Sequence, residues 1–100
     1  MDRARRFTYI DGREVEANSA IGFFEKLRSG EKVPPPDLPC YLDLIRSRGA
    51  FGYGVDLDVG APSLDIGARC RRALASLIRH GWVRICPRGV RTSELVARRA

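Results

Sequence analysis

Hydrophobic and polar positions alternate in the first part of the chain. Segments 7–10 (Phe-Thr-Tyr-Ile) and 13–16 (Arg-Glu-Val-Glu) each have the two-residue period of a short strand. Asp11 and Gly12 lie between them and are a favoured pair for a two-residue turn, in which both central residues adopt positive φ. The pattern therefore predicts a β-hairpin near the start of the chain.

The period changes to that of a helix after the hairpin. Asn18 and Ser19 are capping residues ahead of segment 20–28, and Gly30 lies just past its end. One face of this helix collects Ile21, Phe24 and Leu27. The next run, Val33-Pro34-Pro35-Pro36, lacks most backbone donors and is stiff. We therefore expect a ββα element over residues 1–32, a Pro-rich seam over 33–36 and a second unit over 37–100.

The second unit begins with a helix and a strand. Segment 38–48 starts beside Asp37 and Pro39, which suit a helix N-terminus, and Gly49 follows its end. Its apolar stripe consists of Leu38, Leu42 and Ile45. Over residues 51–59, apolar residues alternate with glycine and aspartate, which predicts a strand with one buried face. These apolar residues are Phe51, Tyr53, Val55, Leu57 and Val59.

The helix expected over residues 63–80 has the clearest pattern. Ser63 offers an N-cap, and Asp65 places an acidic side chain in the first turn. The apolar face consists of Ile66, Cys70, Leu74 and Leu77. The polar side consists of Arg72 and Arg79, which point away from that face, and of Arg69 and Arg71 on its flanks.

Two further strands are expected after Gly81, which ends this helix. Residues 82–85 predict the first strand, residues 87–89 a turn and residues 90–92 the returning strand. The whole chain therefore predicts a small α+β single domain. In it, an N-terminal β-hairpin and helix precede an α-β-α-ββ unit.

The charge of the chain is segregated. Its net charge is +6. Residues 67–100 carry nine arginines and one acidic residue, whereas residues 37–66 carry two arginines and five acidic residues. Arginine outnumbers lysine by sixteen to two over the whole chain, so the choice of arginine at any one position says little. The concentration of positive charge in the last third favours an anionic partner.

Segment 69–83 reads Arg-Cys-Arg-Arg-Ala-Leu-Ala-Ser-Leu-Ile-Arg-His-Gly-Trp-Val. It resembles the recognition helix and following strand of winged helix-turn-helix transcription regulators, in particular bacterial regulators of the GntR type. The shared pattern is Ala-Leu-x-x-Leu-x-x-x-Gly-x-Val, and the resemblance extends over residues 65–90. It implies a winged-helix-like unit for residues 37–100. The interval between Val59 and Ser63 is too short for the second helix of that fold. Three explanations stay open: that helix is vestigial, residues 51–59 do not form the predicted strand, or the fold is another α+β arrangement.

The resemblance implies a DNA-binding transcriptional regulator. Its helix would approach the major groove, and its two strands would form a wing that reaches a phosphate or the minor groove. The residues expected to contact nucleic acid are Arg69, Arg71, Arg72, Ser76, Arg79, Arg84, Arg88 and Arg91. Most of these contacts would be to phosphate. Double-stranded DNA is the expected partner, and a homodimer would engage two half-sites.

Two other functions are compatible with the sequence. A small protein-binding regulator or inhibitor, such as an antitoxin or a phage-encoded inhibitor, would use the arginine-rich surface on an acidic protein partner. An accessory protein of RNA or the ribosome would use the same charge on RNA. Binding to duplex DNA, single-stranded DNA, RNA and acidic proteins distinguishes these functions.

Catalysis and metal binding are not indicated by the sequence. Cys40, Cys70 and Cys86 form no Cys-x-x-Cys pair, and His80 is the only histidine. The carboxylates at positions 56 and 58 lack a third acid or a base nearby in the sequence. We therefore expect a protein that is not an enzyme and that needs no cofactor and no metal.

The chain shows no signal for a membrane. No apolar run approaches the roughly 18 residues that a membrane-spanning helix requires. The charged N-terminal residues are not followed by the apolar stretch of a secretory signal. We therefore expect a cytoplasmic protein without a membrane partner.

Overall fold

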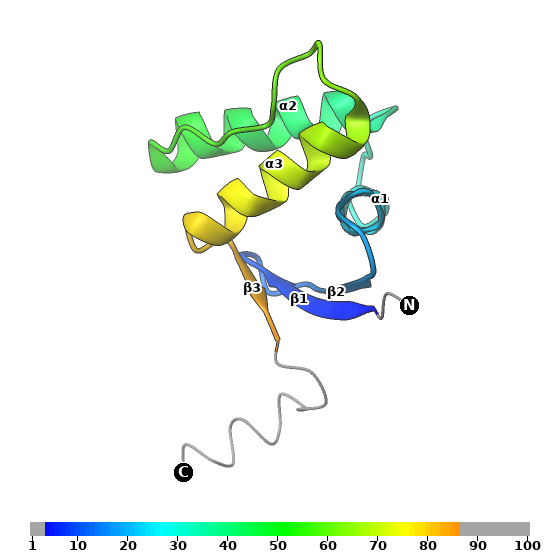
Figure 1. The fold of residues 1–100 in the computed structure, drawn as a ribbon. Helices are drawn as coiled ribbons and strands as arrows, with labels where there is room; N and C mark the ends of the chain where they lie inside the picture. The colour runs from blue at the N-terminus through cyan, green and yellow to red at the C-terminus, as the bar shows by residue number, and fades with distance from the viewer. Residues whose placement is uncertain (1–3, 87–100) are drawn as a thin grey trace.

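The computed structural model describes residues 4–86, and Figure 1 shows their arrangement. The elements in chain order are β1 (Arg5–Tyr9), β2 (Glu14–Ala17), α1 (Ala20–Ser29), α2 (Leu38–Arg48), the π-helical turn η1 (Gly49–Tyr53), α3 (Ile66–Arg79) and β3 (Val83–Ile85). The strands form one antiparallel sheet in the order β2-β1-β3. The three α-helices lie on one face of this sheet (Figure 1). This arrangement confirms the predicted class, a small α+β domain.

The sheet joins segments from both ends of the described chain. β1 pairs with β2 as the predicted hairpin, and on its other side it pairs with β3, where Tyr9 is opposite Val83 and Thr8 is opposite Arg84. Tyr9 and Val83 are buried against the helices. Because neighbouring residues of a strand point to opposite faces, Thr8 and Arg84 lie on the face away from the helices. The strand predicted over 82–85 is confirmed, and its partner within the described residues is β1.

The turn of the hairpin differs from the predicted one. The N–H of Tyr9 donates to the carbonyl oxygen of Arg13 over 2.8 Å, and the N–H of Gly12 donates to the carbonyl oxygen of Tyr9 over 2.8 Å. The loop therefore has three residues, of which only Gly12 has a positive φ, at 93°. The two-residue turn is wrong because Asp11 keeps a negative φ. Its carboxylate instead accepts from the N–H and the Nε of Arg13, over 3.0 and 2.7 Å.

Both helices predicted next are present, with the predicted caps. The Ser19 hydroxyl accepts from the N–H of Gly22 at the start of α1, and the Asp37 carboxylate accepts from the N–H of Cys40 at the start of α2. The buried side chains are Phe23, Phe24 and Leu27 in α1 and Leu38, Tyr41, Leu42 and Ile45 in α2. Ile21 was expected on the buried face of α1 but is 37% exposed. The buried face centres on positions 23 and 24 because α1 contacts β2, α2 and α3 together.

A single carboxylate ties the hairpin to the second helix. Glu31, just past α1, accepts hydrogen bonds from Arg13 Nη2 at 3.0 Å, from Arg48 Nη2 at 3.0 Å and from the Tyr41 hydroxyl at 2.9 Å. Arg13 Nη1 also donates to the carbonyl oxygen of Leu27 at the end of α1, over 3.1 Å. These contacts join residues that precede the seam at 33–36 to residues that follow it. Residues from both sides of the seam also form one hydrophobic core.

The strand predicted over residues 51–59 is wrong. The helical path of α2 continues through η1, and Gly54, with φ of 65°, ends it in the left-handed conformation. Residues 55–60, here called the covering segment, then run back along α2 without a strand partner (Figure 1). Leu57 and Val59 of this segment are buried, whereas Phe51 is 92% exposed. Within residues 51–59, buried apolar side chains thus alternate with exposed polar ones only in the covering segment. This segment packs on helices.

The boundaries of α3 are set by Asp65 and Gly81. The carboxylate of Asp65 accepts from the N–H of Ala68 over 2.7 Å, so Asp65 is the N-cap in place of Ser63. Gly81 adopts φ of 77°. The N–H of Trp82 donates to the carbonyl oxygen of Leu77, which is the Schellman arrangement that commonly closes a helix. Gly81 therefore ends the helix as predicted.

Candidate nucleic-acid interface

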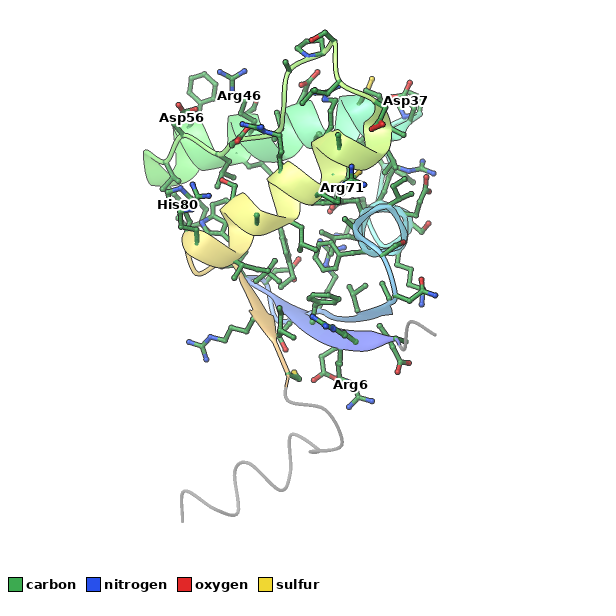
Figure 2. All side chains as sticks on the ribbon, viewed as in Figure 1. Arg6, Asp37, Arg46, Asp56, Arg71 and His80 are labelled. Carbon is green, nitrogen blue, oxygen red and sulfur yellow. The ribbon has the colours of Figure 1, made fainter. Side chains whose placement is uncertain are left out.

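The exposed side of α3 is positively charged. The helix contains four arginines and no acidic residue. Arg71, Arg72 and Arg79 are exposed, and we call them the α3 basic face. At about 100° per residue, Arg72 and Arg79 lie on one side of the exposed Ala75 and Arg71 lies on the other. Figure 2 shows Arg71 on α3. The short alanine side chain between these arginines lets a flat or grooved partner approach the helix closely.

Two of the predicted contact residues do not reach this surface. Arg69 is 7% exposed and Ser76 is 1% exposed. Arg69 Nε donates to the carbonyl oxygen of Val59 over 3.1 Å, and its Nη2 lies 3.6 Å from Asp43 Oδ1. The Ser76 hydroxyl accepts from the N–H of Asp58 over 3.0 Å. Arg69 and Ser76 were predicted to contact nucleic acid, but in this structure both are buried and bind neighbouring parts of this chain.

The close approach of the covering segment to α3 depends on Gly60. Its φ is 74°, and a Cβ at this position would lie 3.1 Å from the Cα and the Cγ of Arg69. Glycine accepts this backbone conformation and leaves room for Arg69. As a result, the buried side of α3 is wider than the apolar pattern predicts. It includes Arg69, Ala73 and Ser76 in addition to Cys70 and Leu77.

Arg72 stays on the surface but has an internal partner. Its Nε and Nη2 both lie 3.2 Å from Asp58 Oδ2. Asp58 Oδ1 also accepts from the N–H of Gly60 over 2.9 Å. This main-chain hydrogen bond, together with the contact to Arg72, holds the pKa of Asp58 below its ordinary value. Asp58 is therefore ionised at neutral pH and offsets part of the charge of Arg72.

An open groove of about 410 Å³ lies along the covering segment. Arg46 of α2 and Arg72 of α3 line it, together with Asp56 and Asp58 of the covering segment. Arg46 Nε lies 3.9 Å from Asp56 Oδ1, and both side chains are mostly exposed. Ion pairs between exposed groups are weak, so an anionic ligand can compete for Arg46 and Arg72.

The other predicted contact residues lie elsewhere. Arg84 is exposed on the face of the sheet away from the helices, so it does not join the α3 basic face in one continuous patch. Arg88 and Arg91 lie outside the described residues, as do the turn at 87–89 and the strand at 90–92. Their contribution to an interface stays a prediction.

The exposed end of α2 is a further candidate surface, and the predicted strand over 51–59 concealed it. Arg46 lies on this end, and Phe51 and Tyr53 follow it in η1 with 92% and 61% of their area exposed. A signal for this arrangement is present in the sequence Gly49-Ala50-Phe51-Gly52-Tyr53-Gly54. Three glycines in six residues disfavour a regular strand and indicate a turn.

The described residues offer little other chemistry. Within residues 4–86, no three side chains among His, Cys, Asp and Glu are grouped so as to hold a metal ion. Burial raises the pKa of the Cys70 thiol, which makes it a poor nucleophile at neutral pH. In the same part of the chain, no helix has both the length and the apolar character needed to cross a membrane.

The α3 basic face is therefore the strongest candidate for a binding surface. The chain matches no protein-family model, no curated protein sequence and no solved structure.

Proposed function

We propose that this protein binds nucleic acid and that the α3 basic face contacts the phosphate backbone. The observation that carries the proposal is the absence of acidic residues from α3, combined with exposed arginines on both sides of Ala75. Guanidinium groups form bidentate hydrogen bonds with phosphate oxygens. A single helix has the width to enter the major groove of duplex DNA.

The three arginines differ in how readily they can bind phosphate. Arg71 and Arg79 form no ion pair with a carboxylate of residues 4–86, so they can bind without breaking an internal contact. Arg72 has to leave Asp58, at a small free-energy cost because both groups are about half exposed. Contacts of this kind position a protein on its ligand but do not read a sequence.

Duplex DNA is the ligand that we propose, in keeping with the resemblance of residues 65–90 to the winged-helix regulators. One copy of the α3 basic face offers few contacts, so a homodimer bound to two half-sites is part of the proposal. The compartment that we propose is the cytoplasm. If the same arginines instead bind an acidic protein, the protein would be a regulator or inhibitor of that partner.

Fluorescence anisotropy with labelled duplex DNA, single-stranded DNA and RNA of equal length tests the proposal. We expect the wild-type protein to bind the duplex. Arg79→Ala should weaken binding roughly fivefold, the equivalent of about 1 kcal/mol. Lys32→Ala removes an exposed cation outside α3 and should leave the affinity unchanged. Absence of binding to any nucleic acid at low salt would contradict the proposal and favour the acidic protein partner.

A further inference from the structure

The turn after α2 presents an aromatic side chain to solvent. Phe51 lies in η1 and is 92% exposed, more than any other large hydrophobic side chain among the described residues. A phenylalanine in this position adds nothing to the hydrophobic core. π-Helical turns occur frequently at functional sites, and an exposed aromatic ring is a common feature of binding surfaces. Phe51 is therefore placed to contact a ligand.

The residues around Phe51 hold the turn in place. The ring of Tyr53 packs edge-on against Trp82, with ring centroids 4.8 Å apart, and Trp82 packs in the same way against Tyr9 at 6.3 Å. At the other end of η1, a Cβ on Gly49 would lie 2.8 Å from Leu57 Cδ1, so the backbone is packed closely there. Because η1 is anchored at both ends, the backbone at Phe51 loses little conformational freedom when a ligand binds.

Two arginines lie at this end of the molecule, together with the exposed carboxylate of Asp56, which pairs with Arg46 at 3.9 Å. η1 directly follows the last turn of α2, which carries Arg46. The contact between Tyr53 and Trp82 brings η1 close to the end of α3, which carries Arg79. Figure 2 shows Arg46 and His80 at this end of the molecule. The partial negative charge of the two helix C-termini stabilises the two arginines, and they in turn attract an anionic ligand.

We propose that Phe51 stacks on an unpaired base of the bound nucleic acid and that Arg46 and Arg79 hold the neighbouring phosphates. This inference rests on the proposed function and defines its preferred substrate, a duplex that continues into unpaired nucleotides. Arg79 belongs both to the α3 basic face and to this site, which places the unpaired base next to the bound duplex. Every base has a π-face, so the site would accept any base. The arginines in the last turns of α2 and α3 favour a nucleic acid over an apolar partner.

Two duplexes of identical sequence test the inference, one blunt and one with a short overhang that carries 2-aminopurine. Stacking quenches the fluorescence of 2-aminopurine. The wild-type protein should bind the overhang duplex about tenfold more tightly than the blunt one, and it should quench the probe. Phe51→Ala should lose the preference and the quenching but bind the blunt duplex like wild type.

Two further variants sharpen the test. Phe51→Leu keeps an apolar side chain without a ring, so it should behave like Phe51→Ala. Val33→Ala is a matched control, because Val33 is also an exposed apolar residue, 87% exposed, but lies in the Pro-rich seam. It should leave both affinities and the quenching unchanged. Because Phe51 and Val33 are exposed, all three variants should unfold at the wild-type temperature.

The outcomes separate this inference from the proposed function. Equal wild-type affinity for the two duplexes, without quenching, would overturn the inference and leave nucleic-acid binding by α3 intact. Preference and quenching that persist in Phe51→Leu would also contradict it, because the contact would then be apolar and not stacking. Failure of the wild-type protein to bind either duplex would refute the proposed function itself.

Discussion

Arg69 Nε donates a hydrogen bond to the main-chain carbonyl oxygen of Val59 over 3.1 Å. The same guanidinium group lies 3.6 Å from Asp43 of α2. One buried side chain of α3 therefore holds both the covering segment and the neighbouring helix. The arginines of α3 thus have two different roles, because Arg69 stabilises the fold whereas Arg71, Arg72 and Arg79 are exposed to a ligand.

Replacement of Arg69 should lower stability far more than replacement of Arg72. Arg69→Met keeps a long side chain but leaves the Val59 carbonyl without its donor, so we expect a loss of about 2 kcal/mol in the free energy of unfolding. Arg72→Met removes a half-exposed ion pair and should change it by less than about 0.5 kcal/mol. Urea unfolding followed by the fluorescence of Trp82, the only tryptophan, measures both. Equal losses would contradict the structural role of Arg69.

A comparison of two glycines tests how closely the covering segment packs on α3. Gly12 and Gly60 both have positive φ, but a Cβ on Gly12 meets no atom within 4 Å, whereas a Cβ on Gly60 meets Arg69 at 3.1 Å. Gly12→Ala should cost about 1 kcal/mol of stability through backbone strain alone. Gly60→Ala adds a steric conflict and should cost about 2–3 kcal/mol. Similar losses in urea unfolding would show that the segment is not closely packed.

Glu31 should make the stability sensitive to acid. Its hydrogen bond from Arg48, followed by those from Tyr41 and Arg13, lowers the pKa of Glu31 from 4.5 to about 2. Because the pKa is lower in the folded state, the stabilisation is complete above pH 4.5 and is lost as the pH falls towards 2. It amounts to about 3 kcal/mol at neutral pH.

The free energy of unfolding, measured from pH 7 to pH 2 in wild type and in Glu31→Gln, tests this linkage. The wild-type value should fall across the acidic window more steeply than that of Glu31→Gln, which is less stable at pH 7. Profiles that run parallel over the whole range would show that Glu31 contributes nothing to the acid sensitivity.

Asp58→Asn should strengthen nucleic-acid binding. The substitution releases Arg72 from its ion pair, while the asparagine oxygen can still accept from the N–H of Gly60. We expect a gain in affinity of about threefold for duplex DNA. Glu16→Gln is the matched control, because it makes the same change in net charge on the face of the sheet that points away from the helices. If both variants gain equally, the effect comes from net charge alone and does not involve Arg72.

The local features of the fold follow from the sequence. Ser19, Asp37 and Gly81 act at helix ends through hydrogen bonds to residues nearby in the chain, so their roles can be predicted without tertiary information. The path of residues 51–59 cannot be predicted in this way. Alternating Val55, Leu57 and Val59 fit a paired strand and an extended segment packed on a helix equally well.

The site was predicted only in part for the same reason. The segregation of charge pointed to α3, and the exposed Arg71, Arg72 and Arg79 follow from helical geometry. The burial of Arg69 and Ser76 depends on the covering segment, whose alternating pattern predicted a strand in a sheet. The position of Arg84 depends on its pairing with Thr8, a residue near the other end of the chain.

The salt dependence of duplex binding tests the central claim most directly. Two double variants lose the same charge from opposite sides of the molecule: Arg71→Ala with Arg79→Ala on α3, and Arg6→Ala with Arg84→Ala on the sheet face away from the helices, where Figure 2 shows Arg6. Each lost phosphate contact should lower the slope of log K against log salt by about 0.9. We predict that the α3 variant lowers the magnitude of the slope by about 2 and that the sheet variant leaves it unchanged. Equal reductions, or a larger one in the sheet variant, would contradict nucleic-acid binding by the α3 basic face.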